Sequence, residues 1–201
     1  MKKNQVVKMM QLAILTAIVF LFQMLGTFIH IGPTSVSLVL IPIVIGALIL
    51  GPKAGAFLGF VFGCITLWAG ITGSDYFTNV LFTSQPFATT LICISKGTLA
   101  GLGAGLVYNA IKRKSAFVGA ILASAAAPII NTGIFVLGGL FLVNKTLETN
   151  LSNFGAGGQT VIYFVIIGCA GLNFIAEFIV NLVVSPAINT VVNTVKKHIK
   201  H

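Results

Sequence analysis

The sequence predicts an all-α membrane protein, a bundle of six transmembrane helices with both termini in the cytoplasm. Three observations lead to this fold class. Of 201 residues, 57% are hydrophobic and only 7% are charged, whereas a soluble domain carries about 25% charged residues. Six stretches approach or exceed the roughly 20 apolar residues that a helix needs to cross a bilayer. The basic residues cluster between these stretches, nearly all on one side of the predicted membrane.

The first three helices are expected at about 9–26, 36–51 and 53–72. The first follows Lys2 and Lys3, as a signal peptide would, but its apolar run exceeds the usual core of about 7–15 residues and no clear cleavage site follows. We therefore expect it to be retained. The second helix is short and interrupted by Pro42. Gly51 and Pro52 separate it from the third, because Gly-Pro pairs favour turns.

The last three helices are expected at about 86–111, 116–143 and 159–194. A basic turn at 112–115 separates the fourth from the fifth, and Pro128 breaks the fifth. The segments 73–85 and 144–158 are polar, and we expect them to lie outside the bilayer, with 73–85 as a loop. No soluble segment is long enough to fold alone, so residues 1–201 are predicted to form a single membrane domain.

The basic residues predict the orientation, because cytoplasmic loops carry an excess of Lys and Arg. With six spans, both termini share a side. That side carries ten bases: Lys2, Lys3, Lys8, Lys53, Lys112, Arg113, Lys114, Lys196, Lys197 and Lys200. The opposite side has Lys145 alone, with Asp75 and Glu148. Both termini are therefore predicted to be cytoplasmic.

Composition and motifs exclude several function classes. The formal net charge of +9 could suggest a nucleic-acid partner, but bases in short clusters between apolar spans fit membrane topology better. The chain has no phosphate-binding loop of the GxxxxGK[ST] type and no metal-binding His–Cys cluster. We expect no cofactor and no enzymatic activity. Any energy source must be a partner or an ion gradient.

Polar residues inside the apolar spans are the candidates for function. Two charges, Lys96 and Glu177, lie deep within predicted helices, where a charge costs about 2.5–3.5 kcal/mol and needs a partner or a cavity. Asn173, Glu177 and Asn181 fall within an arc of about 80° on the last helix, so that face must point inward. The remaining candidates are Asn131, after the break at Pro128, and Trp68 and Gln85 near the outer ends of their helices.

Two interpretations of these residues stay open. In the first, Lys96 and Glu177 neutralise each other, the asparagines are hydrogen-bonding glue between helices, and Trp68 is an interfacial anchor. In the second, they converge on a pocket for a polar solute. A bundle this small has little other reason to collect so many polar groups, which favours the pocket.

Two further sets of small residues lie inside the spans. Cys64, Cys93 and Cys169 have no metal-ligand spacing and are interpreted as buried thiols. Ala13 and Ala17, four residues apart in "AILTA", would let another helix approach closely, although this spacing is frequent in Ala-rich helices.

Together these features resemble the S components of energy-coupling factor (ECF) vitamin transporters, the subunits that bind the substrate. The resemblance covers nearly the whole chain. Its more specific pieces are "LGPKAGAFLGFVFG" across the second and third helices and the "NFIAEFIVN" of the sixth. "AILTA", "SKGTLAGLGAGLVYNAIKRK" and "PIINTGIF" support it. Where many relatives have Arg in the fourth helix, this chain has Lys96, which keeps the charge but loses bidentate geometry.

The resemblance implies a protein of the bacterial cell membrane that captures a vitamin from outside. It implies docking on a transmembrane coupling subunit driven by two cytoplasmic ATPases, with Ala13 and Ala17 on the docking surface. The segment 73–85, with Asp75, Tyr76 and Asn79, and the loop with His30 would serve as lids over the pocket.

Among S components the sequence looks most like the pantothenate type, particularly in "GPTSVSLVLIPIVIGA" and around Asn131. Lys96 would neutralise the carboxylate of pantothenate, while Asn131, Gln85 and Asn173 would serve its amide and hydroxyls. Riboflavin, folate and cobalamin stay open as substrates. A stand-alone ion-coupled carrier with Glu177 as relay group also stays open, although the chain shows no clear inverted repeat.

Overall fold

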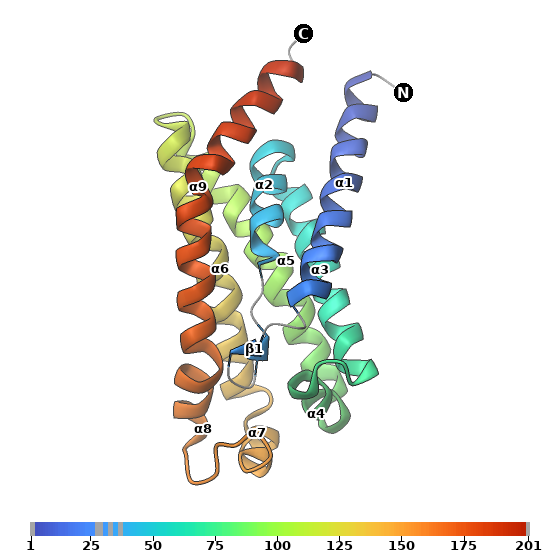
Figure 1. Ribbon diagram of the computed structural model, residues 1–201, viewed down its shortest axis with the longest axis vertical. Helices are drawn as coiled ribbons and strands as arrows, with labels where there is room; N and C mark the ends of the chain where they lie inside the picture. The colour runs from blue at the N-terminus through green and yellow to red at the C-terminus, as the bar shows by residue number, and fades with distance from the viewer. Residues whose placement is uncertain (1–2, 27–29, 32–33, 36–37, 200–201) are drawn as a thin grey trace.

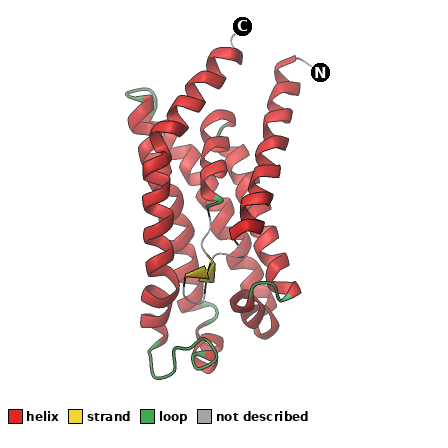
Figure 2. Cartoon of the chain, in the orientation of Figure 1, coloured by secondary structure: helices red, strands yellow, loops and turns green. Residues whose placement is uncertain are grey.

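The computed structural model describes residues 3–26, 30–31, 34–35 and 38–199. It is a helical bundle with one very short hairpin (Figures 1 and 2). In chain order its elements are α1 Lys3–Gly26, β1 His30–Ile31, β2 Thr34–Ser35, α2 Leu40–Leu50, α3 Pro52–Thr72, α4 Tyr76–Ser84, α5 Pro86–Ile111, α6 Ala116–Phe141, α7 Asn144–Asn150, α8 Val161–Tyr163, η1 Phe164–Gly171 and α9 Leu172–Ile199. β1 and β2 pair antiparallel, with His30 opposite Ser35.

Five of the predicted spans are long and apolar enough to cross a membrane among the described residues. These are Gln5–Gly26, Pro52–Thr72, Pro86–Ile111, Ala116–Phe141 and the run Val161–Val192. The second predicted span is shorter than expected, since α2 has 11 residues and a length of about 16 Å. It ends at Gly51, whose φ of +103° suits glycine alone, and Pro52 begins α3.

Both polar segments contain a short helix, which corrects the expectation of a loop at 73–85. α4 lies within 73–85 and α7 within 144–158. α4 follows Gly73, which adopts a left-handed conformation, and Asp75, which holds the N-cap position. Figure 1 shows α4 and α7 at the end of the bundle opposite the two chain termini. These helices therefore cap one end of the bundle.

Glycine brings α3 and α5 into backbone contact at the centre of the bundle. A Cβ atom added to Gly59 would lie 1.9 Å from the carbonyl oxygen of Gly97, and one added to Gly101 would lie 2.0 Å from that of Gly55. Glycines recur every four residues at 55, 59 and 63 on α3 and at 97, 101 and 105 on α5. Gly55 meets Gly101 and Gly59 meets Gly97, while Gly63 faces the backbone of Cys93 and Gly105 faces Pro52. Because helices associate in lipid mainly by close packing, this contact fixes the residues next to it, including Lys96.

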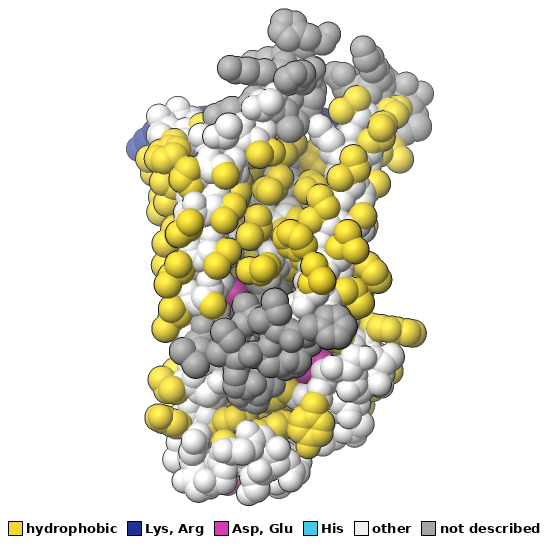
Figure 3. Space-filling view, in the orientation of Figure 1, with side chains coloured by type: hydrophobic (Ala, Val, Ile, Leu, Met, Phe, Trp, Pro, Cys, Tyr) yellow, Lys and Arg dark blue, Asp and Glu magenta, His cyan; other side chains and the backbone are white. Residues whose placement is uncertain are grey.

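The outside of the bundle is apolar. In Figure 3 yellow hydrophobic side chains are spread along the helices, whereas the end formed by α4 and α7 is mostly white, the colour of other side chains and the backbone. Phe60, Trp68, Phe117 and Leu137 are among the exposed large side chains. Cys64 is also exposed, so the prediction that all three cysteines are buried is wrong for this residue, while Cys93 and Cys169 are buried. Cys64 lies four residues from both Phe60 and Trp68, on the outward face of α3.

The last span departs from a regular α-helix at two places, η1 and Pro186. After the single turn of α8 it continues with the π-helical turns of η1, and π-helical turns inside helices are frequent at functional sites. Pro186 lies within α9, and its missing N–H leaves the carbonyl of Leu182 without its usual donor. The hydroxyl of Ser185 donates to that carbonyl at 2.7 Å. The helix therefore continues through the proline without an orphaned acceptor at this position.

Candidate substrate-binding site

A partly open cavity lies where the helices meet below the capping end. It is lined by residues from α1, α3, α4, α5, α6, η1 and α9: Gln23, Phe62, Thr66, Asp75, Phe77, Thr78, Lys96, Asn131, Thr132, Phe135, Cys169, Ala170, Asn173 and Glu177. Polar groups from helices far apart in the sequence thus converge on one space.

Four of the six predicted binding residues lie in the wall of this cavity: Lys96, Asn131, Asn173 and Glu177. They come from α5, α6 and α9. The third member of the polar face on α9, Asn181, is buried but not in the wall. Its amide donates to the backbone carbonyl of Glu177 at 2.8 Å. On the polar face of α9, Asn173 and Glu177 therefore face the cavity, whereas Asn181 forms a hydrogen bond within the helix.

Trp68 and Gln85 are not brought to the cavity. The side chain of Trp68 is 65% exposed and borders an apolar groove between α1 and α3 together with Phe20 and Met24. Gln85 holds the N-cap position of α5, and its backbone carbonyl accepts a hydrogen bond from Thr89. Helix rotation decides the first case, because residues two positions before and after Trp68, Thr66 and Gly70, are buried while Trp68 faces outward.

The ammonium group of Lys96 lies between aromatic rings. Its Nζ atom is 5.4 Å from the ring centroid of Phe62 and 5.8 Å from that of Phe135. The described residues form no salt bridge with it, so the predicted pairing of Lys96 with Glu177 is not seen although both line the cavity. Cation–π contacts weaken near the outer limit of about 6 Å. The rings therefore only partly replace the hydration that the cation has lost.

Asn131 presents an acceptor without a partner. The residue is 6% exposed, and among the described residues its Oδ1 atom receives no hydrogen bond. Leaving a buried acceptor unsatisfied costs about 1–3 kcal/mol. An acceptor in this state in a cavity wall is suited to a ligand that brings an N–H or O–H group.

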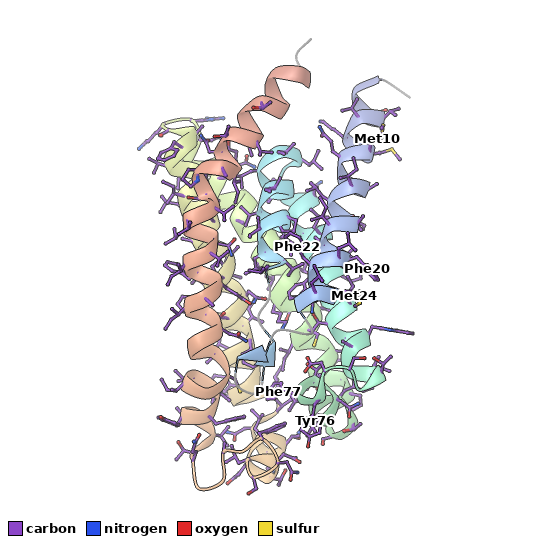
Figure 4. The ribbon with its side chains drawn as sticks, viewed as in Figure 1. Met10, Phe20, Phe22, Met24, Tyr76 and Phe77 are labelled. Carbon is purple, nitrogen blue, oxygen red and sulfur yellow. The ribbon has the colours of Figure 1, made fainter. Side chains whose placement is uncertain are left out.

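α4 supplies residues that the sequence interpretation treated only as a lid. Asp75 and Thr78 line the cavity, and the Thr78 hydroxyl donates to Asp75 Oδ2 at 2.7 Å. Asn79 instead donates to the carbonyl of Gly70 at 2.7 Å and holds α4 against the end of α3. Figure 4 labels Tyr76 and Phe77 at the start of α4; Phe77 is buried and lines the cavity, whereas Tyr76 is 58% exposed. The other predicted lid, around His30, lies largely outside the described residues.

Sequence reasoning also missed Gln23 and Thr66, which lie 3.4 Å apart between Nε2 and Oγ1. Gln23 is a polar residue in an apolar span, so the rule that identified Lys96 could have found it. It missed the phenylalanines as well. Phe62, Phe77 and Phe135 line the cavity, and the rings of Phe77 and Phe135 are 6.0 Å apart. The chain has sixteen phenylalanines, and nothing in the sequence distinguishes these three from the others.

Ala13 and Ala17, the predicted docking residues, are both exposed on α1. The buried residues of this helix segment, Leu15 and Val19, lie on the opposite side, since each residue turns the helix by about 100°. Met10 is 59% exposed and points away from the bundle in Figure 4. The two alanines therefore lie on an outward face of α1.

The comparisons with known proteins identify the family of the chain. The model of the family "ECF transporter, substrate-specific component" matches residues 7–189, and the chain belongs to that family. It is a substrate-binding subunit of a transport system in the cell membrane, not an enzyme. Among characterised relatives, the pantothenic acid transporter PanT of Lactococcus lactis subsp. cremoris (strain MG1363) is 32% identical over 167 residues, which cover 76% of this chain and 82% of that protein.

Proposed function

We propose that this protein is the pantothenate-binding S component of an ECF-type importer, and that the cavity described above is its binding site. ECF S components bind vitamin substrates and work with a membrane coupling subunit and ATPases. The similarity to PanT supports pantothenate as the substrate. The cavity supports a small anionic solute.

The observation that carries the proposal is the cation of Lys96 in a cavity wall without a carboxylate partner among the described residues. A charge at membrane depth costs about 2.5–3.5 kcal/mol. A cation–π contact at a site open to solvent stabilises the cation by about 0.5–1 kcal/mol. The two rings near Lys96 thus offset only part of the cost. A ligand carboxylate supplies the missing compensation, because charge-assisted hydrogen bonds contribute about 1.5–3 kcal/mol.

The remaining polar groups of the cavity match the rest of pantothenate. Its amide N–H and two hydroxyls are donors, and the unpartnered Oδ1 of Asn131 is an acceptor. Asn173, which was predicted to share this task, lines the same cavity. Gln85, predicted for the same role, is left out of this proposal because it lies away from the cavity.

The three phenylalanines of the wall favour a second candidate. Aromatic side chains are common partners of flat ring systems. The rings of Phe62, Phe77 and Phe135 in the cavity wall therefore favour riboflavin more than the sequence did. Mass spectrometry of the small molecule retained by the detergent-purified protein separates the two. Retained pantothenate supports the proposal, and a retained flavin contradicts it.

A titration tests the role of Lys96. We expect pantothenate to bind purified protein roughly 10- to 150-fold more tightly than panthenol, its alcohol analogue, which corresponds to one charge-assisted hydrogen bond. Lys96→Met should abolish the difference. Lys112→Met is the matched control, since Lys112 also lies over a ring, Tyr108 at 5.7 Å, but outside the cavity. Equal affinity of the wild type for both ligands would show that Lys96 does not recognise the carboxylate.

Orientation and partners form the second half of the proposal. Figure 1 shows both termini at one end of the bundle, and the basic turn 112–115 follows the end of α5 that lies away from α4. By the positive-inside rule the termini are cytoplasmic, and the α4 end, near the cavity, faces outward. Co-purification tests the partners: we expect a coupling subunit and two ATPases, whereas a stand-alone carrier brings none.

A further inference from the structure

A second, smaller and more enclosed cavity adjoins the binding cavity on the side of α4, α6 and α7. The two cavities share Phe77, Thr78, Lys96 and Phe135. Thr89, Cys93 and Lys96 lie on one face of α5, so the second cavity runs from Lys96 toward the start of that helix. Lys96 therefore lies at the junction of the two spaces.

The wall of the second cavity is apolar. Leu81, Ile92, Val143 and Leu147 form much of it, and all four are buried. Its two hydroxyl groups already donate within the protein: Thr89 to the carbonyl of Gln85 at 2.9 Å and Thr78 to Asp75 at 2.7 Å. None of its described residues has a buried polar side-chain atom without a hydrogen-bond partner. The space offers nothing to a polar ligand beyond Lys96 at its mouth.

We infer that this second cavity is a subsite for a short alkyl group attached to the carboxyl end of the ligand. The inference rests on the proposed function, because it places that carboxyl end at Lys96. From Lys96 the ligand's polar part occupies the first cavity, and any extension of the carboxyl group enters the second. The protein should therefore bind pantothenate derivatives in which the carboxyl group carries a small apolar substituent.

The position of the subsite also explains what limits its ligands. Gly139 lines the second cavity and leaves room that a side chain would take. A Cβ atom at this position would lie 3.3 Å from Val165 and 3.7 Å from Leu147. Residues from α5, α6 and α7 close the space, so we expect it to accept chains of a few carbons and to reject longer ones.

The test compares the N-methyl and N-butyl amides of pantothenate in titrations of the detergent-purified protein. Both amides lack the carboxylate, so the loss of its contact with Lys96 cancels between them. Each methylene that enters an apolar cavity raises affinity about fourfold. We expect the N-butyl amide to bind more than tenfold more tightly than the N-methyl amide in the wild type, and longer chains to lose this gain.

Thr89→Met fills the subsite, because the flexible methionine side chain packs into irregular gaps. We expect both amides to bind this variant equally, with the affinity for pantothenate within about twofold of the wild type. Thr90→Met is the matched control. Thr90 makes the same kind of bond, its hydroxyl donating to the carbonyl of Pro86 at 2.8 Å, but it does not line the cavity. It should keep the preference for the N-butyl amide.

Gly139→Ala provides an independent variant if Thr89→Met does not fold, with Gly133→Ala as its control. Apart from its neighbours in the same helix, no atom of the residues that the structure describes lies within 4 Å of a Cβ added at Gly133. Gly139→Ala should reduce the preference for the N-butyl amide, and Gly133→Ala should not.

The possible failures are distinguishable. If pantothenate binds but the wild type shows no preference for the N-butyl amide, the subsite is refuted and the proposed function stands. A preference that survives in Thr89→Met also refutes it, because the chain then lies elsewhere. If pantothenate does not bind while the amide series still shows the preference, the proposed substrate is wrong and the apolar subsite is supported.

Discussion

At the scale of single residues, two buried oxygen atoms offer a contrast. Asn131 Oδ1 and Ser124 Oγ are both buried on α6, and among the described residues neither has a hydrogen-bond partner. Only Asn131 lines the cavity. An unpartnered buried acceptor lowers stability. At Asn131 ligand binding would compensate this cost, and at Ser124 it would not.

This contrast gives a prediction. Asn131→Leu, a change of similar volume, should raise the thermal unfolding temperature of the empty protein, because it removes a buried acceptor that costs about 1–3 kcal/mol. The same change should weaken pantothenate binding by roughly 2- to 13-fold, the equivalent of one ordinary hydrogen bond of about 0.5–1.5 kcal/mol. Titration and thermal unfolding in one detergent measure both effects.

Ser124→Ala is the control for Asn131→Leu. It removes an unpartnered oxygen that lies outside the cavity wall. The unfolding temperature should therefore change, while the affinity for pantothenate should stay the same. Should Asn131→Leu bind pantothenate as tightly as the wild type, Asn131 has no part in binding and its amide is only a structural element.

At the scale of the elements, the packing of α3 against α5 decides where Lys96 lies. Gly97 follows Lys96 directly and touches Gly59 through backbone atoms. The fold-level importance of this contact was not visible in the sequence, which shows the glycine spacing on each helix but not which two rows meet. The structure shows that they meet at the level of the cavity.

We predict that Gly59→Ala destabilises the protein. The added Cβ would lie 1.9 Å from the carbonyl oxygen of Gly97, so the helices must move apart, and overpacking of this kind costs about 1–3 kcal/mol. Pantothenate binding should weaken as well, because Lys96 moves with α5. Thermal unfolding and titration of the same sample give the two values.

Gly133→Ala is the matched control on a helix surface with open space around the new Cβ. It should leave the unfolding temperature unchanged or raise it slightly, because alanine favours the helix over glycine by about 1 kcal/mol. Equal unfolding temperatures for Gly59→Ala and Gly133→Ala would mean that α3 and α5 are not in backbone contact.

At the scale of the whole molecule, binding and docking should be separable. The cavity lies inside the bundle, while Ala13 and Ala17 are exposed on the outward face of α1. No residue of that outward face lines the cavity. A bulky group on this face can block another helix without reaching the substrate.

We therefore predict that Ala17→Trp abolishes uptake of labelled pantothenate and co-purification of the ATPases, because it prevents close approach of another helix. Titration of the isolated variant should give the wild-type affinity. Ala187→Trp, the same substitution at an exposed position of α9, is the control and should keep uptake. Normal uptake by Ala17→Trp would place the docking surface elsewhere.

The sequence by itself determined the class of the protein and most of its helices. Composition and the length of the apolar runs suffice for that, because a bilayer admits few other solutions for such a chain. The sequence also indicated four residues of the cavity wall, because polar residues in apolar spans must face the interior. These are Lys96, Asn131, Asn173 and Glu177. The rule needs no knowledge of how the helices pack.

Only the tertiary structure decided which of the candidates share a cavity. Trp68 and Gln85 have the same polar or amphipathic character as the others, but helix rotation turns Trp68 outward and the start of α5 places Gln85 away from the wall. Asp75 and Thr78 reach the cavity because α4 folds back over the bundle. Local sequence does not encode the direction in which a short capping helix packs. Tertiary contacts, such as the hydrogen bond from Asn79 to the carbonyl of Gly70, set that direction.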